Sequence, residues 1–443
     1  MFTYLHVKNF KSLVDFTIDF RNNRNTPRKL NIIYGENGAG KSNIVDVFDF
    51  IKRILFSRVL VPSLNIDDDS QDVSKIINFI SQQNLISNII KDYKTIEYDD
   101  NMHIQCGIKL GKICYEYVIE TDNERIIYEK LSLIKNQQIE NIFEISMEHY
   151  NIQIVTNNKN YIKELSTEID KYWGKHAFIS IVLYEIHDKM LKYVTKNMNK
   201  HIIKIINIFL GYNLSKQMNK YGINRVDSNI LLFVNNINSG RIKLEKQYLL
   251  NTTEKILNSI ITSLYSDIKQ IYYEIKIDED EVEYKLYCKK IIGNKLINIP
   301  FIRESTGTQK LFELIPLFVS SLDGNVVIID EFDTGIHDLM VKALLENFAE
   351  HIKGQLILTT HSTTLMEANI KKDNIYILDI LSNRTKEVYS IIDYENKLHP
   401  YLNIRKRYLA GAYGGVPHTN DIDFDEISEI MNHAKKRKNN KTQ

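Results

Sequence analysis

The 443-residue sequence has only three cysteines, six prolines and one tryptophan. The cysteines, Cys106, Cys114 and Cys288, are scattered, so they match neither a metal site nor a disulfide framework, which favours a reducing cytoplasm. The 57 basic residues balance 56 acidic ones, and a net charge of +1 gives no global case for nucleic-acid binding. No apolar run has membrane-spanning length, so we expect no membrane partner.

The composition predicts a globular chain, because 43% of the residues are hydrophobic and 26% are charged. A length of 443 residues is enough for several structural units. Residues 1–134 combine a glycine-rich loop with alternating segments over 102–134 that predict an antiparallel lobe. Helical periodicity predicts a helical insertion over 135–270. Strands and then alternating helices and strands are expected over 271–395. Residues 396–443 form a C-terminal segment whose basic tail, from residue 433, we expect to be disordered.

The most specific motif is the octapeptide at residues 35–42, which fits the phosphate-binding pattern G-x-x-x-x-G-K-[ST]. A β-prone apolar run at 30–34 precedes it, and an apolar helical pattern at 43–55 follows it. This order brings backbone N–H groups and a helix N-terminus to one polyphosphate. Lys41 is expected near the β- and γ-phosphates and Ser42 on Mg²⁺. The predicted ATP-binding residues here are Gly35, Glu36, Asn37, Gly38, Ala39, Gly40, Lys41, Ser42 and Asn43.

A second motif, residues 325–331, consists of a buried strand that ends in two carboxylates. Asp330 is placed to hold Mg²⁺ and Glu331 to polarise an attacking water. Phosphoryl transfer needs positioning and charge neutralisation more than covalent help, so these groups with Lys41 and Ser42 form nearly a complete catalytic set. ATP and Mg²⁺ are therefore the predicted substrate and cofactor.

Two further features lie on either side of this strand. Ser305 has the type and position of an N-cap for an apolar helix at 311–320, and such a helix start is also an anion site. His361 follows the strand at 355–360, at the end that faces the ligand crevice in sheets of this kind. Each feature alone is more often structural than functional.

The ordered series of motifs resembles the ABC-type ATPase heads of the SMC and RecF kind. The resemblance covers residues 1–57 and 295–395. It implies an α/β fold, namely a P-loop NTPase head with a mixed sheet, an antiparallel lobe and an inserted helical domain. It also implies that Lys41, Glu331 and His361 are catalytic, that Lys11 in the first turn helps to bind ATP, and that two heads dimerise head-to-tail around ATP. The residues then implied to act in trans are Ser305, Gly307, Thr308 and Gln309.

Two departures from that family affect the interpretation. Glu304 replaces the usual leading residue of the signature, as in the smaller relatives. The glutamine that senses Mg²⁺ in the family is not evident, and Gln82, Gln83 and Gln105 all remain candidates.

The segment Ile404–Pro417 also resembles the closing motif of compact phage-defence ATPases of the AriA (PARIS), RloA and AbiLi type. That resemblance implies an ATPase, acting as a homodimer or larger homo-oligomer, that controls a separately encoded effector, a nuclease. Too few residues follow His361 for a fused nuclease of the OLD kind. A RecF-like repair ATPase that binds DNA directly is the alternative, and a transporter ATPase is disfavoured.

Overall fold

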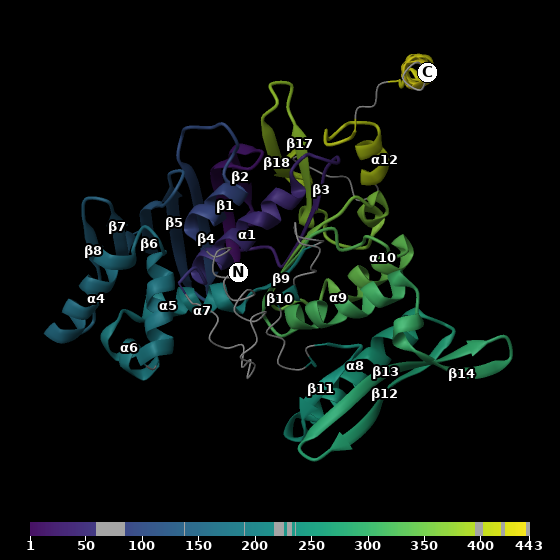
Figure 1. The fold of residues 1–443 in the computed structure, drawn as a ribbon, viewed down its shortest axis with the longest axis horizontal. Coiled ribbons are helices and arrows are strands. Elements are labelled where there is room, and N and C mark those ends of the chain that lie inside the picture. The colour runs from purple at the N-terminus through teal and green to yellow at the C-terminus, as the bar shows by residue number, and fades with distance from the viewer. Residues whose placement is uncertain are drawn as a thin grey trace.

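A computed structural model describes residues 1–58, 85–136, 138–189, 191–216, 226–227, 233–234, 236–394, 402–417 and 421–439 (Figure 1). The candidate glutamines at 82 and 83 and the acidic residues at 67–69 lie outside these ranges. None of the helices within the described ranges is long and apolar enough to cross a membrane.

A seven-stranded sheet with the order β10-β9-β15-β16-β3-β17-β18 forms the centre of the molecule. Its five inner strands are parallel, while β10 and β18 run antiparallel at the two edges. The strands are β3 (Leu30–Tyr34), β9 (Asn213–Ser215), β10 (Val226–Asp227), β15 (Val326–Ile329), β16 (Gln355–Thr359), β17 (Ile375–Ile380) and β18 (Lys386–Ser390). The predicted strands before the octapeptide, before Asp330 and before His361 are all confirmed.

A second seven-stranded sheet, β2-β1-β4-β5-β6-β7-β8, is antiparallel throughout. It confirms the antiparallel lobe that the alternating sequence predicts. Its strands are β1 (Phe2–Phe10), β2 (Leu13–Asp19), β4 (Met102–Leu110), β5 (Ile113–Thr121), β6 (Ile126–Lys135), β7 (Gln138–Ser146) and β8 (Tyr150–Ile152).

Helix α1 (Lys41–Leu55) lies between the two sheets, and its apolar side chains belong to the same core as theirs (Figure 1). Side chains of β3 alternate across the central sheet: Ile33 packs into the α1 core, whereas Ile32 packs into a second core on the opposite face. Because both faces are covered by apolar elements, the strands β3, β15 and β16 are fully buried.

The opposite face carries α9 (Thr306–Leu322), α10 (Asp338–Phe348) and a smaller sheet packed on α8 (Tyr248–Leu264). The strands of this sheet are β11 (Ser239–Lys243), β12 (Ile268–Asp278), β13 (Glu281–Ile292) and β14 (Lys295–Pro300). Short 3₁₀ turns, η1 (Leu244–Lys246), η2 (Phe301–Arg303), η3 (Thr363–Glu367) and η4 (Lys372–Asn374), join these elements.

The predicted helical insertion at 135–270 is narrower than expected. Its helices are α4 (Lys159–Tyr172), α5 (Phe178–Lys189), α6 (Leu191–Asn197) and α7 (Lys200–Gly211). Before them, β7 and β8 extend the antiparallel sheet, and after them β9 pairs with β15 in the central sheet. The helices share the α1 core, so this region is integrated into the head. Helix α3 (Ile86–Tyr93) also belongs to this core.

The C-terminal segment contains α11 (Ile391–Tyr394), α12 (Ile404–Leu409) and α13 (Phe424–Asn439). The expectation of a disordered basic tail is wrong up to residue 439, because α13 covers this stretch. Figure 1 shows α13 standing away from the rest of the molecule.

Candidate functional site

The loop between β3 and α1 has the backbone shape that a phosphate loop needs. Gly38 and Gly40 have φ angles of 82° and 112°, a left-handed region that favours glycine. Gly35 lies so close to β17 that a Cβ atom there would be 2.8 Å from the carbonyl oxygen of Leu378. Local backbone geometry or steric crowding therefore favours glycine at positions 35, 38 and 40.

Lys41 is the first residue of α1, and its ammonium group turns back over the loop. Nζ donates to the carbonyl oxygens of Gly35 at 2.7 Å and Glu36 at 3.0 Å. The side chain is buried, and this burial lowers the pKa of the Lys41 ammonium to about 8, against a smaller opposing effect of nearby carboxylates. Among the described residues Lys41 forms no ion pair with a carboxylate, and such a desolvated cation is well suited to receive a phosphate.

Thr359, at the end of β16, contacts both of the predicted acidic residues. Its hydroxyl donates to Asp330 Oδ1 at 2.6 Å and accepts the backbone N–H of Glu331 at 2.8 Å. Asp330 also receives a hydrogen bond from Ser42, and burial raises the pKa of its carboxyl group. Sequence analysis missed Thr359, because its role depends on the pairing of β15 with β16.

Glu331 adopts a left-handed backbone conformation with φ of 46°, which is uncommon for a residue with a Cβ atom. Such conformations persist where surrounding contacts hold them, and here the bond from its N–H to Thr359 does so. The conformation turns the Glu331 carboxylate away from the buried strand, and its side chain is 31% exposed. It is therefore open to water, unlike the buried Asp330.

His361 bridges the two halves of the site. Its Nδ1 lies 3.2 Å from Lys41 Nζ, and its Nε2 lies 3.5 Å from Glu331 Oε1. Because an ammonium group can only donate, Nδ1 is the acceptor in this contact, which places the ring proton on Nε2 toward Glu331. The structure thus brings the three predicted catalytic residues together.

Asp333 lies in the turn after Glu331, where Thr360 Oγ1 donates to its carboxylate at 2.7 Å. Burial raises the pKa of the Asp333 carboxyl group. Thr359 and Thr360 therefore hold acidic residues on either side of Glu331, so the strand that carries His361 also organises the acidic turn.

Ser305 is the N-cap of α9, as predicted, and its Oγ accepts the N–H of Thr308 at 3.2 Å. A Cβ atom on Gly307 would lie 2.3 Å from the carbonyl oxygen of Gly335, so only glycine fits against the turn after Asp333. Gln309 donates to the carbonyl oxygen of Glu304 at 2.8 Å. Within the described residues, no hydrogen bond or ion pair joins Ser305, Gly307, Thr308 or Gln309 to the phosphate loop.

Two other predicted residues are engaged elsewhere. Lys11 pairs with Asp46 on α1 and lies over the ring of Tyr93, so the geometry does not support its assignment to ATP. Gln105 lies in β4 and donates to the hydroxyl of Tyr4 at 2.9 Å, within the antiparallel sheet. Gln105 is therefore a poor candidate for a magnesium sensor.

The C-terminal glycine motif packs against the strands that carry the site. Tyr408 donates to the carbonyl oxygen of Gly415 at 2.6 Å, and the N–H of Gly415 donates to Asp379 of β17 at 2.7 Å. The rings of Tyr408 and Tyr34 are 6.5 Å apart, which places α12 beside the strand end that precedes the phosphate loop. This motif is a brace on the head.

The donor set fits Mg²⁺. Ser42 and Asp330 offer hard oxygen ligands next to the phosphate loop. Among the described residues, no cluster of three or more His, Cys, Asp or Glu side chains could hold a metal ion. Magnesium is usually bound by one or two carboxylates together with substrate phosphates and water, so a sparse protein ligand set agrees with this ion.

The fold and this constellation define an α/β P-loop NTPase head with a mixed central sheet and an antiparallel lobe. The chain belongs to the AAA ATPase domain family, whose model matches residues 1–366. Membership of this family implies nucleotide binding. The C-terminal brace lies beyond the matched residues.

Three solved structures are among those similar to the chain. The SMC head domain from Thermotoga maritima is 14% identical, with 88% of this chain and 98% of that chain covered and a TM-score of 0.37. An SMC head bound to the C-winged helix domain of ScpA is 15% identical, with 88% and 98% covered and a TM-score of 0.43. The SMC head from Pyrococcus furiosus, bound to the C-terminal domain of ScpA, is 16% identical, with 88% and 96% covered and a TM-score of 0.39. No curated protein matches the sequence.

The first prediction concerns the pH dependence of nucleotide affinity. The Lys41 ammonium is charged below its pKa of about 8 and loses its proton above it. A bound phosphate raises that pKa, so ATP affinity should be greatest below pH 8 and fall by about tenfold between pH 7 and pH 9. Calorimetric titrations across this range measure the effect. In Lys41→Arg the guanidinium stays protonated, so the fall should vanish, and a fall that persists in this variant would contradict the assignment.

The second prediction concerns Thr359. Thr359→Val keeps the shape of the side chain but removes the hydroxyl that holds Asp330 and Glu331. Partners of this kind typically contribute about 10- to 100-fold to activity or metal affinity, so the Mg²⁺-dependent ATPase rate should fall by that factor. Thr359→Ser retains the hydroxyl and is the matched control. Equal rates for the valine and serine variants would exclude the proposed role.

Proposed function

We propose that this chain is an ATPase that hydrolyses ATP with Mg²⁺ as a nucleotide-dependent switch of the ABC-type head kind. The observation that carries the proposal is the convergence of Lys41, His361 and Glu331, whose charged or polar atoms form consecutive contacts of 3.2 and 3.5 Å. Lys41 begins helix α1 after β3, while Glu331 and His361 follow β15 and β16, and the three groups meet beside the phosphate loop.

Each group has a distinct chemical role in this proposal. Lys41 neutralises charge on the β- and γ-phosphates, and Glu331 accepts the proton of the attacking water. His361, with its proton on Nε2, donates a hydrogen bond to the γ-phosphate or to the water. Ser42 and Asp330 would hold Mg²⁺, which supplies neutralisation of charge that develops on the phosphate oxygens.

We further propose that a second copy of the chain completes each site. The capped start of α9 offers backbone N–H groups to an anion. Ser305 and the phosphate loop share no contact among the described residues, so a bound nucleotide would reach the signature of another copy. Ile302, just before the start of α9, and Leu339, in the first turn of α10, have exposed side chains that are 63% and 62% accessible. They would be covered in such a dimer.

A mixing experiment tests both parts of this proposal. Chains with Lys41→Ala keep the signature, and chains with Ser305→Arg keep the phosphate loop. Each should be inactive alone, whereas a one-to-one mixture should recover about a quarter of the parental ATPase rate, because half the random dimers contain one intact site of two.

The matched control mixes Lys41→Ala with Glu331→Gln. Lys41 and Glu331 belong to the same site in one chain, so this mixture should remain inactive. Rescue in neither mixture would exclude assembly in trans. Hydrolysis by purified Glu331→Gln at the parental rate would remove Glu331 from the mechanism.

The biological role we propose is control of a separately encoded effector, a nuclease, in anti-phage defence. Two observations support this role: the C-terminal motif resembles that of phage-defence ATPases, and helix α13 exposes apolar side chains. Its residues Phe424, Ile430 and Met431 are 68%, 61% and 53% exposed, which is unusual for an apolar helix stripe and suits a protein partner. The alternative, direct binding of DNA, is less favoured because Arg405 of α12 already contacts Glu367 and Thr363.

Substitutions in α13 separate these roles. The double variant Phe424→Ser, Met431→Ser should no longer co-purify with the effector, which we expect a neighbouring gene to encode. It should also lose phage protection while its ATPase activity persists. Glu429→Ala, on the same helix, is the control that should retain both. Protection by this chain without any neighbouring gene, together with tight DNA binding in an anisotropy assay, would overturn the effector role and favour the alternative.

A further inference from the structure

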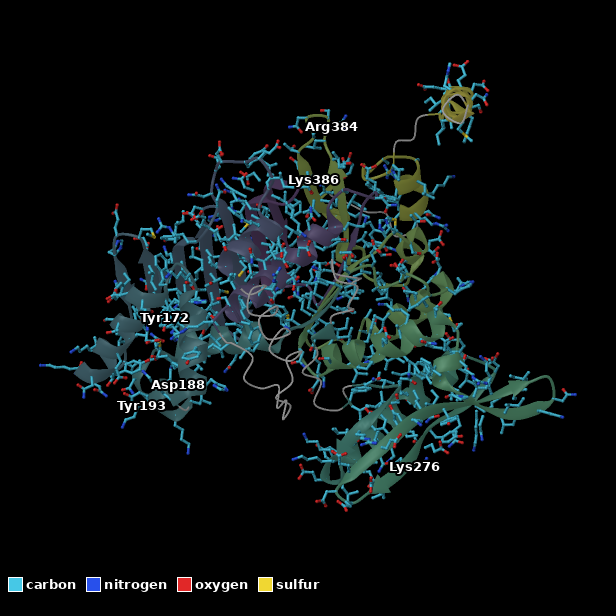
Figure 2. The ribbon with its side chains drawn as sticks, viewed as in Figure 1. Tyr172, Asp188, Tyr193, Lys276, Arg384 and Lys386 are labelled. Carbon is cyan, nitrogen blue, oxygen red and sulfur yellow. The ribbon has the colours of Figure 1, made fainter. Side chains whose placement is uncertain are left out.

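A second lysine reaches the phosphate loop from an element that the motif pattern does not include. Lys386 is the first residue of β18, in the hairpin that β17 and β18 form at the edge of the central sheet. Its Nζ donates to the carbonyl oxygen of Gly38 at 3.3 Å and also contacts Ser12 Oγ. Figure 2 shows Lys386 on the body side of the hairpin and Arg384 at its tip.

The ammonium group of Lys386 has polar neighbours but no counterion among the residues that the structure describes. Its partners are a carbonyl oxygen and a hydroxyl, and within the described part of the chain it forms no ion pair with a carboxylate. Partial burial lowers the pKa of this ammonium. A half-buried cation that faces only neutral oxygen atoms is electrostatically incomplete, and an anion at this position would stabilise it.

The position of Lys386 differs from that of Lys41 along the loop. Lys41 contacts the first two carbonyl groups, beside His361 and the catalytic carboxylates. Lys386 lies at the far end, where a Cβ atom on Gly40 would be 3.1 Å from its Nζ. Asn43, in the first turn of α1, donates to Ser12 at 2.6 Å and so belongs to the same group.

General phosphate-loop geometry then assigns a phosphate to each lysine. The loop N–H groups cradle the α- and β-phosphates, while the motif lysine reaches the β- and γ-phosphates. A cation at the opposite end of the loop from the γ-phosphate groups faces the α-phosphate.

We propose that Lys386 binds the α-phosphate of the nucleotide, with Ser12 and Asn43 holding its ammonium group in place. This inference rests on the ATP-binding part of the proposed function and extends it to a residue outside the known motifs.

The surrounding structure fixes the hairpin that carries this lysine. Lys386 pairs with Ile380 across the hairpin. Asp379, one residue earlier, accepts the N–H of Gly415 in the C-terminal brace, and Tyr389 contacts the carbonyl oxygen of Tyr413. The brace therefore positions Lys386 relative to the loop.

Calorimetry with ADP and with a non-hydrolysable ATP analogue tests the proposal on the full-length chain. Lys386→Met retains most of the aliphatic side chain and removes the charge. Both ligands carry the α-phosphate, so both affinities should fall by the same factor, about 10- to 100-fold for one charge-assisted bond. Lys386→Arg should recover much of the loss.

Arg384→Asn is the matched control. It removes a positive charge from the same hairpin at a left-handed position, φ 67°, that asparagine tolerates. It should bind both ligands with parental affinity. Thermal melting of each variant checks that the fold is intact.

Three outcomes would overturn the inference. Parental affinities in Lys386→Met would remove Lys386 from the site. Weaker binding of the ATP analogue alone would place it at the γ-phosphate. An equal loss in Arg384→Asn would reduce the effect to general electrostatic attraction. By contrast, a parental chain that binds neither nucleotide would refute the proposed function itself.

Discussion

The position of β16 between β3 and β15 is the constraint on which the whole site depends. These strands are parallel, so their carboxyl ends open at one edge of the sheet. Lys41 follows β3, His361 follows β16, and Glu331 follows β15. Residues that are 320 positions apart, such as Lys41 and His361, therefore come within hydrogen-bonding distance. Without β16 beside β15, Thr359 could not hold both the Asp330 carboxylate and the backbone N–H of Glu331.

Desolvation gives this arrangement its chemical character. Burial lowers the pKa of Lys41 and raises those of Asp330 and Asp333, so the protein disfavours the charged forms of the ammonium and of both carboxyl groups. Hydrogen bonds from the hydroxyl groups of Thr359 and Thr360 offset only part of the effect of burial on Asp330 and Asp333. A phosphate and a divalent cation at these positions would offset the desolvation of Lys41 and of the two carboxyl groups.

The C-terminal segment connects this chemistry to the surface of the molecule. Tyr408 lies beside Tyr34 of β3, Gly415 contacts Asp379 of β17, and Arg405 contacts the 3₁₀ turn η3 that follows His361. The same segment continues into the exposed helix α13. The described contacts therefore join the nucleotide site to the brace formed by residues 404–417. This segment lies outside the residues that the family model matches.

The sequence by itself determined the local elements and the identities of most site residues. The octapeptide, the strand that ends at Asp330 and the N-cap Ser305 were all predictable, because glycine, acidic and capping residues act through backbone geometry over a few positions. Adjacent motifs also predicted their own strands and helices correctly, including β3, α1 and α9.

Only the tertiary structure decided which distant side chains share the site. Thr359 and Lys386 carry no local signal, since their roles arise from the neighbours that sheet pairing supplies. The same limit explains why Lys11 looked like a ligand but pairs with Asp46, and why residues 135–270 looked like a helical insertion although β9 belongs to the central sheet. Strand order depends on non-local hydrogen bonds and on burial of both sheet faces, and neither is encoded in a short pattern.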